Sequence, residues 1–189
     1  MAAPDAALMA RYEAIRERTM ALAAPLSAAD VQVQSMADAS PAKWHLAHTT
    51  WFFETFVLER FEKGFAPHHA SYRVLFNSYY QGVGEQHPRP QRGLITRPGL
   101  DEVKAYRANV DARIATLLTH APGAELRELM ALGLQHEQQH QELLLMDIQH
   151  LLWQNPFAPA YRRSPATPDQ ADTASKAAGA ADWLAHPGG

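Results

Sequence analysis

Residues 124–154 read AELRELMALGLQHEQQHQELLLMDIQHLLWQ and carry the longest helical pattern in the chain. Apolar residues recur three and four positions apart along this stretch, which is the spacing of one face of an α-helix. The pattern stops at Asn155-Pro156, because proline cannot continue a helix. Within the stretch, His136 and His140 are four residues apart. Residues at that spacing lie on one helix face, about 6 Å apart along the axis, so both imidazoles can reach one metal ion.

Four further segments have helical spacing and recognisable ends. They are residues from about 4 to 22, a short segment after Ser27 as N-cap, residues 41–63 between the N-cap Ser40 and Gly64, and residues 99–120. Residues 65–98 mix prolines and glycines with aromatics, which predicts a long, packed connection with a helical turn near residues 77–80. No strand pattern is found. The sequence therefore predicts an all-α fold, an antiparallel four-helix bundle with a long crossover loop.

The composition restricts the classes of function. The 189 residues suffice for one domain with a sizeable core. The net charge is −3 without a long run of either sign, which does not indicate nucleic-acid binding. There is no cysteine, so any metal must be held by nitrogen and oxygen ligands. No secretory signal and no membrane span of about 18 apolar residues is recognised, so a cytoplasmic location is expected.

The segment His136-Glu137-Gln138-Gln139-His140 also matches H-E-x-x-H, the zinc-protease signature in which the glutamate is the general base. The extended form of that signature needs glycine and histidine at later positions where this chain has Leu143 and Met146. No glutamate follows Glu142 to serve as a third ligand. A protease is therefore disfavoured, while a polar stripe without metal remains an alternative for the histidine pair.

A third ligand is expected in the segment Trp44-His45-Leu46-Ala47-His48. His48 lies one turn after Trp44 and is expected to point inward, whereas His45 is rotated by about 100° from Trp44 and is expected to border solvent. An inward histidine can also be an ordinary core residue. Three neutral imidazoles would leave open positions on a metal, as catalysis requires. Five other histidines show no comparable spacing: His68, His69, His120, His150 and His186.

Arg89 and Arg92 lie three residues apart in a segment held by prolines. Two guanidinium groups at that spacing suit bidentate binding of a carboxylate. Two solvated surface arginines are the simpler alternative.

Three segments together resemble, in order, the N-terminal domain of ergothioneine-synthesis sulfoxide synthases. They are SPAKWHLAHTTWFFETFVLE at 40–59, LFNSYYQGVGEQHPRPQRGLITRP at 75–98 and LGLQHEQQHQELLLMDIQHLLW at 132–153. The resemblance covers residues from about 5 to 160. It implies a DinB-like four-helix fold and a nonheme iron(II) enzyme that uses O2 to join the sulfur of cysteine or gamma-glutamylcysteine to hercynine (trimethylhistidine), giving a sulfoxide.

The resemblance also implies the roles of six residues. His48, His136 and His140 would bind Fe(II), Gln139 would help to hold hercynine, and Arg89 and Arg92 would bind the carboxylates of the thiol substrate. Residues 1–160 would form the metal-binding domain. Residues 161–189 would be a disordered linker to a C-terminal domain like the formylglycine-generating enzyme, which supplies a catalytic tyrosine, so no catalytic residue is assigned within this chain.

Three alternatives remain open at this point. A DinB-like thiol transferase would use zinc or nickel to activate a small thiol. A relative of the sulfoxide synthases could make ovothiol or a selenium analogue. A binding or assembly module without catalysis would keep the histidine cluster as a relic.

Overall fold

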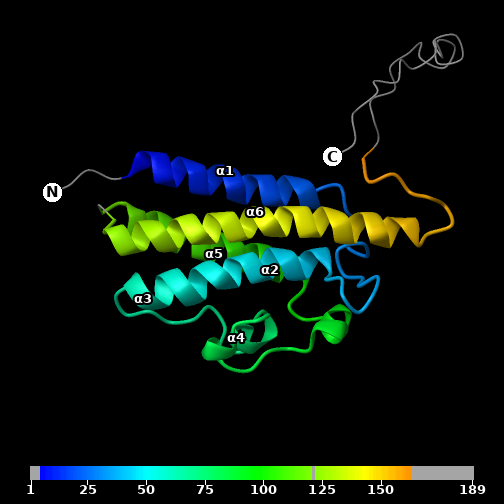
Figure 1. The fold of residues 1–189 in the computed structure, drawn as a ribbon, viewed down its shortest axis with the longest axis horizontal. Helices are drawn as coiled ribbons and strands as arrows, with labels where there is room; N and C mark the ends of the chain where they lie inside the picture. Colours follow the sequence, from blue (N-terminus) through cyan, green and yellow to red (C-terminus); the bar gives the residue numbers. More distant parts are fainter. Residues whose placement is uncertain (1–4, 121, 163–189) are drawn as a thin grey trace, which may run out of the picture.

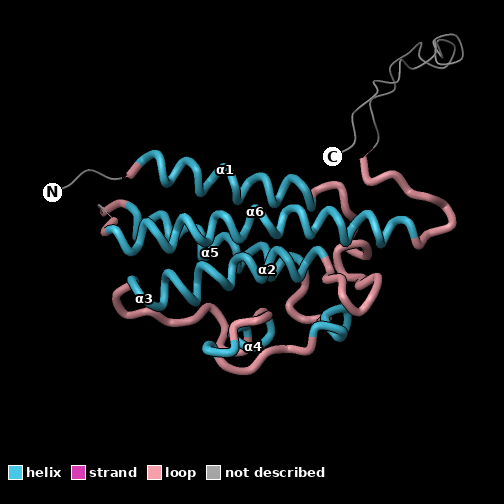
Figure 2. The backbone as a smooth tube through the Cα atoms, viewed as in Figure 1, coloured by secondary structure: helices cyan, strands magenta, loops and turns pink. Residues whose placement is uncertain are grey.

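The computed structural model describes residues 5–120 and 122–162, and within them it contains helices and loops without a strand (Figures 1 and 2). The α-helices are α1 (Ala6–Ala23), α2 (Ala42–Phe52), α3 (Glu59–Phe61), α4 (Tyr72–Leu75), α5 (Leu100–Leu118) and α6 (Ala124–Trp153). A π-helical segment, η1 (Phe53–Leu58), joins α2 to α3, and two 3-10 segments lie in the long loop, η2 (Gln81–Val83) and η3 (Arg89–Leu94). The all-α prediction is therefore confirmed for the described residues. None of the helices in this part of the chain is long and apolar enough to cross a membrane.

Helices α1 and α6 lie side by side and run in the same direction (Figure 1). Contacts between the two helices follow the same order along both: Arg127 donates to Asp5 near one end, and Gln141 donates to Thr19 further toward the other end. Two long segments lie between α1 and α6 in the sequence, and both run in the direction opposite to these two helices.

Those two intervening segments, α2–η1–α3 and α5, are also parallel to each other. Arg107 donates to the Leu46 carbonyl. Further along both segments, Arg113 of α5 forms an ion pair with Glu62, which directly follows α3. The connection after α3 runs back along the bundle to the end where α2 begins, and α5 then starts from there (Figure 1). The pair of α1 and α6 is therefore antiparallel to the pair formed by α2–η1–α3 and α5. The long connection between α3 and α5 allows the second pair to be parallel.

The core is built around the aromatic face of α2 and η1. Trp51, Phe52 and Phe53 are almost completely buried. They pack against apolar residues that α5 and α6 present at helical spacing: Val103, Tyr106, Val110, Ile114, Leu126, Met130 and Leu134. A smaller cluster near the other end of α6 joins Leu144 and Ile148 to Leu22 and Val31.

Four details of the sequence-based prediction differ from the structure. The segment after Ser27 forms turns rather than a helix, although Ser27 and Asp30 exchange the hydrogen bonds that are typical of a helix N-terminus. The Ser40 hydroxyl does not cap α2; it accepts a hydrogen bond from Arg92 instead. The third helical segment ends at Phe61, and Gly64 follows in the loop with a φ of 73°. Helical turns flank residues 77–80 rather than including them.

Residues 161 and 162, which the prediction assigns to a linker, contact the bundle. The Tyr161 hydroxyl donates to the Leu22 carbonyl, and Arg162 donates to the Ala21 carbonyl. The remainder of the predicted linker, residues 163–189, lies outside the described residues, as does His186.

Gly133 marks the closest approach of α6 to η1. A Cβ at this position would lie 2.6 Å from Phe53 Cε1 and 3.1 Å from Phe52 Cε1. In most helices, replacing glycine by alanine adds about 1 kcal/mol of stability. Because both phenylalanine rings are buried and close-packed, we expect Gly133→Ala to lower the free energy of unfolding by at least about 1 kcal/mol. Urea denaturation would measure this change.

Ala105, on the exposed face of α5, is the control for this prediction. There the reverse exchange, Ala105→Gly, should cost about 1 kcal/mol through helix propensity alone. A stabilised Gly133→Ala variant would contradict the close packing of α6 on η1.

Candidate metal centre

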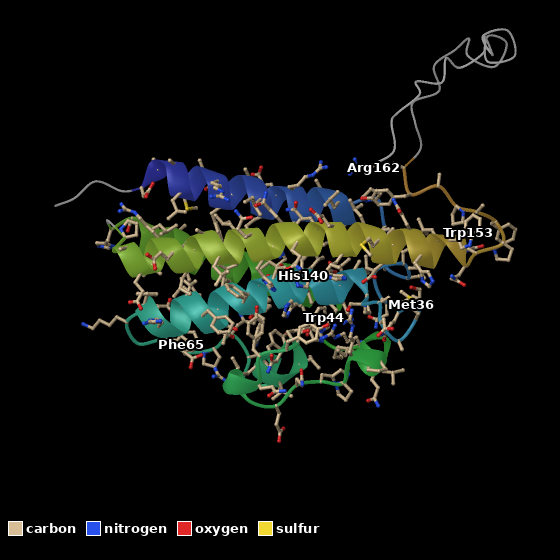
Figure 3. All side chains as sticks on the ribbon, in the orientation of Figure 1. Met36, Trp44, Phe65, His140, Trp153 and Arg162 are labelled. Atoms are coloured by element: carbon tan, nitrogen blue, oxygen red, sulfur yellow. The ribbon has the colours of Figure 1, made fainter. Side chains whose placement is uncertain are left out.

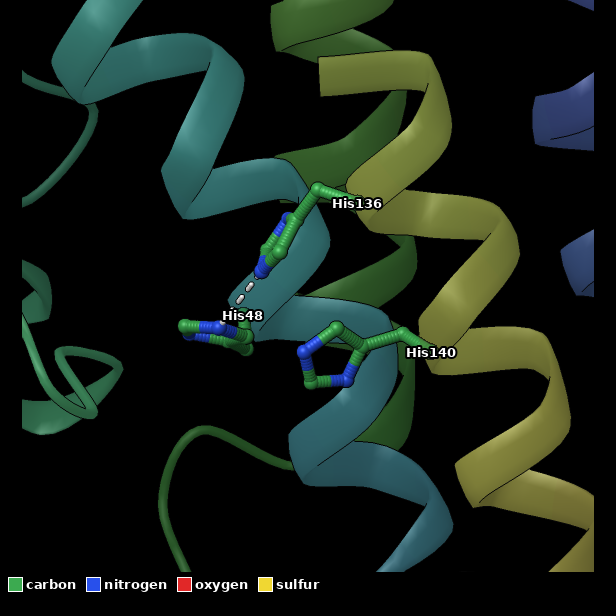
Figure 4. A group of neighbouring side chains, drawn as sticks. All are labelled: His48, His136 and His140. Carbon is green, nitrogen blue, oxygen red and sulfur yellow. Dashed lines mark hydrogen bonds between the residues drawn. The ribbon is translucent and has the colours of Figure 1, made fainter. Parts of the chain in front are cut away.

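Three imidazoles converge between α2 and α6 (Figure 4). Nε2 of His48 lies 3.2 Å from Nε2 of His136, and the ring centres of His136 and His140 are 4.6 Å apart. One ring nitrogen from each histidine can be chosen so that all three lie within 4.8 Å of one another. The spacing of His136 and His140 on one helix face, inferred from the sequence, directs both rings toward α2 (Figure 4). Figure 3 shows the position of His140 between α6 and α2. These three histidines could hold a metal ion.

His48 is held in one orientation. Its Nδ1 lies 2.6 Å from the Phe76 carbonyl, which can only accept, so Nδ1 carries the proton and the lone pair is on Nε2. The ring stacks on Trp44 at a centroid distance of 4.5 Å and an interplanar angle of 12°, and it faces Trp51 on its other side. The Nε2 lone pair therefore points into the cluster.

The donor set suits a divalent metal. Burial, reinforced for His48 and His140 by neighbouring imidazoles, lowers the pKa of all three rings, that of His136 to about 4. They are neutral at pH 7, as metal ligation requires. His136 Nδ1 is buried and has no hydrogen-bond partner among the described residues, so nothing there holds a proton on Nδ1 in preference to Nε2. Because Nε2 of His48 carries a lone pair, Nε2 of His136 donates to it in the metal-free chain. A cation between these two atoms would take the place of that proton and be bound by both lone pairs.

The position of His45 was predicted wrongly. Its side chain is buried, with the residue only 2% exposed, and it does not border solvent. His45 Nδ1 lies 2.9 Å from His140 Nδ1, and His45 Nε2 lies 2.9 Å from a carboxylate oxygen of Asp147. The prediction failed because α2 is buried on every side: all of its residues are inaccessible, with α5 and α6 on one side and the loop 65–98 on the other.

A pocket of about 420 Å³ opens beside the three histidines. Its lining contains all six residues that the sequence singled out as site candidates: His48, Arg89, Arg92, His136, Gln139 and His140. Ser78, Tyr79 and Tyr80 from the long loop form part of the wall, and Met36 and Met146 contribute apolar surface. Residues of the long loop thus lie beside His136 and His140, although they are far from these histidines in the sequence.

The two arginines of the pocket differ in their surroundings. Arg92 is 3% exposed; its guanidinium lies 3.5 Å from the ring centre of Trp44 and donates to the hydroxyls of Ser40 and Ser78. Burial, and then the charge of Arg89, lowers the pKa of Arg92 to about 10, so it stays cationic at neutral pH. Arg89 is partly exposed and donates to the Tyr79 hydroxyl and the Asp38 carbonyl. Neither arginine has a carboxylate partner among the described residues.

Glu137, the glutamate of the H-E-x-x-H pattern, is completely buried and lies outside the pocket lining. It forms ion pairs of 2.9 Å with Arg16 and with Arg107 and accepts a hydrogen bond from Thr19. Desolvation alone would raise the pKa of this carboxyl, but the attraction of Arg16 and Arg107 outweighs it and lowers the pKa to about 2. An ionised carboxylate fixed on another face of the helix cannot serve as a general base in the pocket, which agrees with the rejection of a protease.

The fold and the site define an all-helical protein with a candidate three-histidine metal centre. The family model of the DinB superfamily matches residues 11–144, which is more than half of the chain and includes His48, His136 and His140. The chain belongs to the DinB superfamily. None of the curated proteins compared with this sequence matches it.

His45 and Asp147 are the polar residues of this region that sequence reasoning missed. Asp147 lies seven residues after His140, two helical turns further along the same face. That spacing was a usable signal for a carboxylate near the histidine pair. His45 could not be recognised in the same way, because its burial depends on the packing of the loop.

Replacing Glu137 by glutamine should strongly destabilise the fold. The change leaves Arg107 buried without an anionic partner and Arg16 with Asp111 alone. We expect the free energy of unfolding to fall by about 3 kcal/mol, measured by chemical denaturation. Glu142→Gln, at an exposed position of the same helix, is the control and should change stability by less than about 0.5 kcal/mol. Equal stabilities would show that the ion pairs contribute nothing net.

Proposed function

We propose that this chain is the metal-binding part of a nonheme iron(II), O2-dependent sulfoxide synthase that joins a cysteine-type thiol to hercynine in ergothioneine biosynthesis. The observation that supports this proposal is the shared pocket: three imidazoles, Gln139 and two arginines line one cavity. The overall reaction balances as thiol plus hercynine plus O2 giving the sulfoxide and one water. A four-helix bundle of the DinB type, a cytoplasmic location and a C-terminal partner domain like the formylglycine-generating enzyme belong to the same proposal.

His48, His136 and His140 would hold the metal through ring nitrogens that converge on one point. Iron(II), when bound there, supplies the activation of O2 that the oxidation of the thiol requires. Three protein ligands leave positions free for small molecules, and the neutral imidazoles add no charge that would repel the metal. Trp44 and Trp51 hold the His48 ring from both sides and exclude water from its faces.

The arginines would receive the thiol substrate. Arg89 is the better candidate for direct contact, because it is partly exposed and its present partners are a hydroxyl and a carbonyl. Arg92 is fixed against Trp44 and two serine hydroxyls, so it would act mainly as a fixed positive charge in the wall. Gln139, exposed on α6 beside His140, would present its amide to hercynine.

A metal-dependent thiol transferase is the second candidate. Membership of the DinB superfamily supports it, because this superfamily includes metal-dependent enzymes and the match contains the three histidines. Consumption of cysteine with the electrophile 1-chloro-2,4-dinitrobenzene, catalysed by the zinc- or nickel-loaded chain without O2, would favour the transferase.

The metal site is tested by anaerobic titration with iron(II), followed by calorimetry. We expect one equivalent to bind to the unchanged chain and stoichiometric binding to be lost in His48→Ala and in His140→Ala, since each variant leaves only two imidazoles. His120→Ala, at an exposed position outside the pocket, is the matched control and should bind as the unchanged chain does. Full binding by His140→Ala would reject the assignment of the ligands.

The substrate side is tested with Arg89→Ala. We expect the metal-loaded variant to keep one equivalent of metal but to bind gamma-glutamylcysteine at least about tenfold more weakly, because a charge-assisted hydrogen bond contributes about 1.5–3 kcal/mol. Calorimetric titration with the metal measures the first quantity, and titration of the metal-loaded chain with the thiol measures the second. Arg18→Ala on the exposed face of α1 serves as the control. Unchanged thiol affinity in Arg89→Ala would remove this residue from the substrate site.

A further inference from the structure

We propose that His45 and Asp147 form a positioning dyad that holds His140 as its Nδ1–H tautomer and so directs the Nε2 lone pair of His140 into the metal site. The dyad goes beyond the three candidate ligands, and its relevance to a metal rests on the proposed function. The observation that carries it is a continuous chain of polar contacts from Asp147 through His45 to His140.

The donor and acceptor of each hydrogen bond can be assigned by starting from Asp147, because a carboxylate can only accept. The same carboxylate oxygen of Asp147 accepts from the Ser40 backbone N–H at 2.8 Å and faces His45 Nε2 at 2.9 Å. In the neutral ring of His45 the proton is therefore on Nε2, and Nδ1 is an acceptor. The atom opposite this acceptor, 2.9 Å away, is Nδ1 of His140. His140 therefore donates from Nδ1, and its lone pair is on Nε2.

The opposite arrangement would be costly at this depth. A proton on His45 Nδ1 could still be donated to Nδ1 of His140. It would, however, leave the lone pair of His45 Nε2 facing the Asp147 carboxylate at 2.9 Å, where two acceptors repel each other. His45 is 2% exposed, so water does not replace this lost hydrogen bond, which is worth about 1–3 kcal/mol. The buried geometry thus selects one tautomer of His140.

The selected tautomer matches the orientation of the ring. In Figure 4 the His140 ring presents one nitrogen toward His48 and turns the other away from the cluster. His48 is directed in the same sense by the Phe76 carbonyl. Each of the two buried candidate ligands therefore has its own acceptor on Nδ1, the carbonyl for His48 and the dyad for His140. Such partners usually raise metal affinity by about 10- to 100-fold.

The first test reads the tautomer directly in the metal-free full-length chain. Long-range 1H–15N correlation spectra of 15N-histidine-labelled protein distinguish an Nδ1–H ring from an Nε2–H ring, and His140→Gln identifies the signal. We expect His140 to be an Nδ1–H ring. In Asp147→Ala, which removes the acceptor that His45 Nε2 has among the described residues, we expect a mixture of tautomers at His140. An Nε2–H ring in the unchanged chain, or an unaltered spectrum in Asp147→Ala, would overturn the proposal.

The second test measures affinity with cobalt(II), followed by its visible absorption bands. His45→Phe keeps a ring but removes both nitrogens, and we expect it to weaken cobalt binding by about 10- to 100-fold. His45→Asn places an amide oxygen near the former Nδ1 and should recover most of the affinity, which a purely packing role of the ring would not explain. His69→Phe, on the exposed surface, is the control for the substitution.

A failure of the dyad and a failure of the proposed function would give different results in these tests. If the unchanged chain binds cobalt(II) and His45→Phe binds it equally well with the same spectrum, the dyad is wrong while the metal site stands. If the unchanged chain binds no cobalt(II), the proposed metal site is wrong, and the tautomer of His140 in the metal-free spectra still decides the dyad. Where His45→Phe fails to fold, Asp147→Ala in the same titration takes its place, with the same weakening expected.

Discussion

The ion pairs of Glu137 with Arg16 and Arg107 are the constraint on which the arrangement of the helices depends. Removing a carboxylate and two guanidinium groups from water is expensive, and only close, fully bonded partners offset the cost. Here Asp111 supplies the second negative charge by pairing with Arg16, so two positive and two negative groups balance. Thr19 and Thr50 satisfy further polar atoms. Since these groups come from α1, α2, α5 and α6, the network allows only one relative placement of all four segments.

The same network sets the orientation of the candidate metal centre. Glu137 is rotated around the axis of α6 by about 100° from His136 and about 60° from His140. With Glu137 held between α1 and α5, the two histidines must face α2, where His48 and His45 meet them. One turn of α6 therefore serves two purposes: its ionised residue connects the bundle, and its neutral residues line the pocket. In the H-E-x-x-H segment, the candidate metal ligands are the two histidines, whereas the glutamate has a structural role.

The sequence predicted the features that depend on local periodicity and failed where tertiary packing decides. The long helices and the inward direction of His136, His140 and His48 follow from three- and four-residue spacing. The burial of His45 could not be predicted, because the covering loop has no regular spacing. Arginines at helical positions such as Arg16 and Arg107 usually face solvent, and only the packing of the helices brings Glu137 within 2.9 Å of both of them. Whether the predicted ligands and arginines act as assigned stays a prediction.

The charge distribution of the pocket indicates the kind of molecule that it can receive. The imidazoles form a neutral wall, while Arg92 is a buried cation held by two hydroxyls and an aromatic ring instead of a carboxylate. Two carboxylates also line the pocket, those of Asp38 and Asp147, and the carboxylate of Asp147 accepts from the Ser40 amide and faces His45. A divalent metal would add two further positive charges to this cavity. The two arginines and the two aspartates of the lining are equal in number, so the net positive charge would come from the metal. An anionic ligand, with a carboxylate for the arginine side and a soft donor such as a thiolate for the metal side, would therefore compensate the charge that the metal adds.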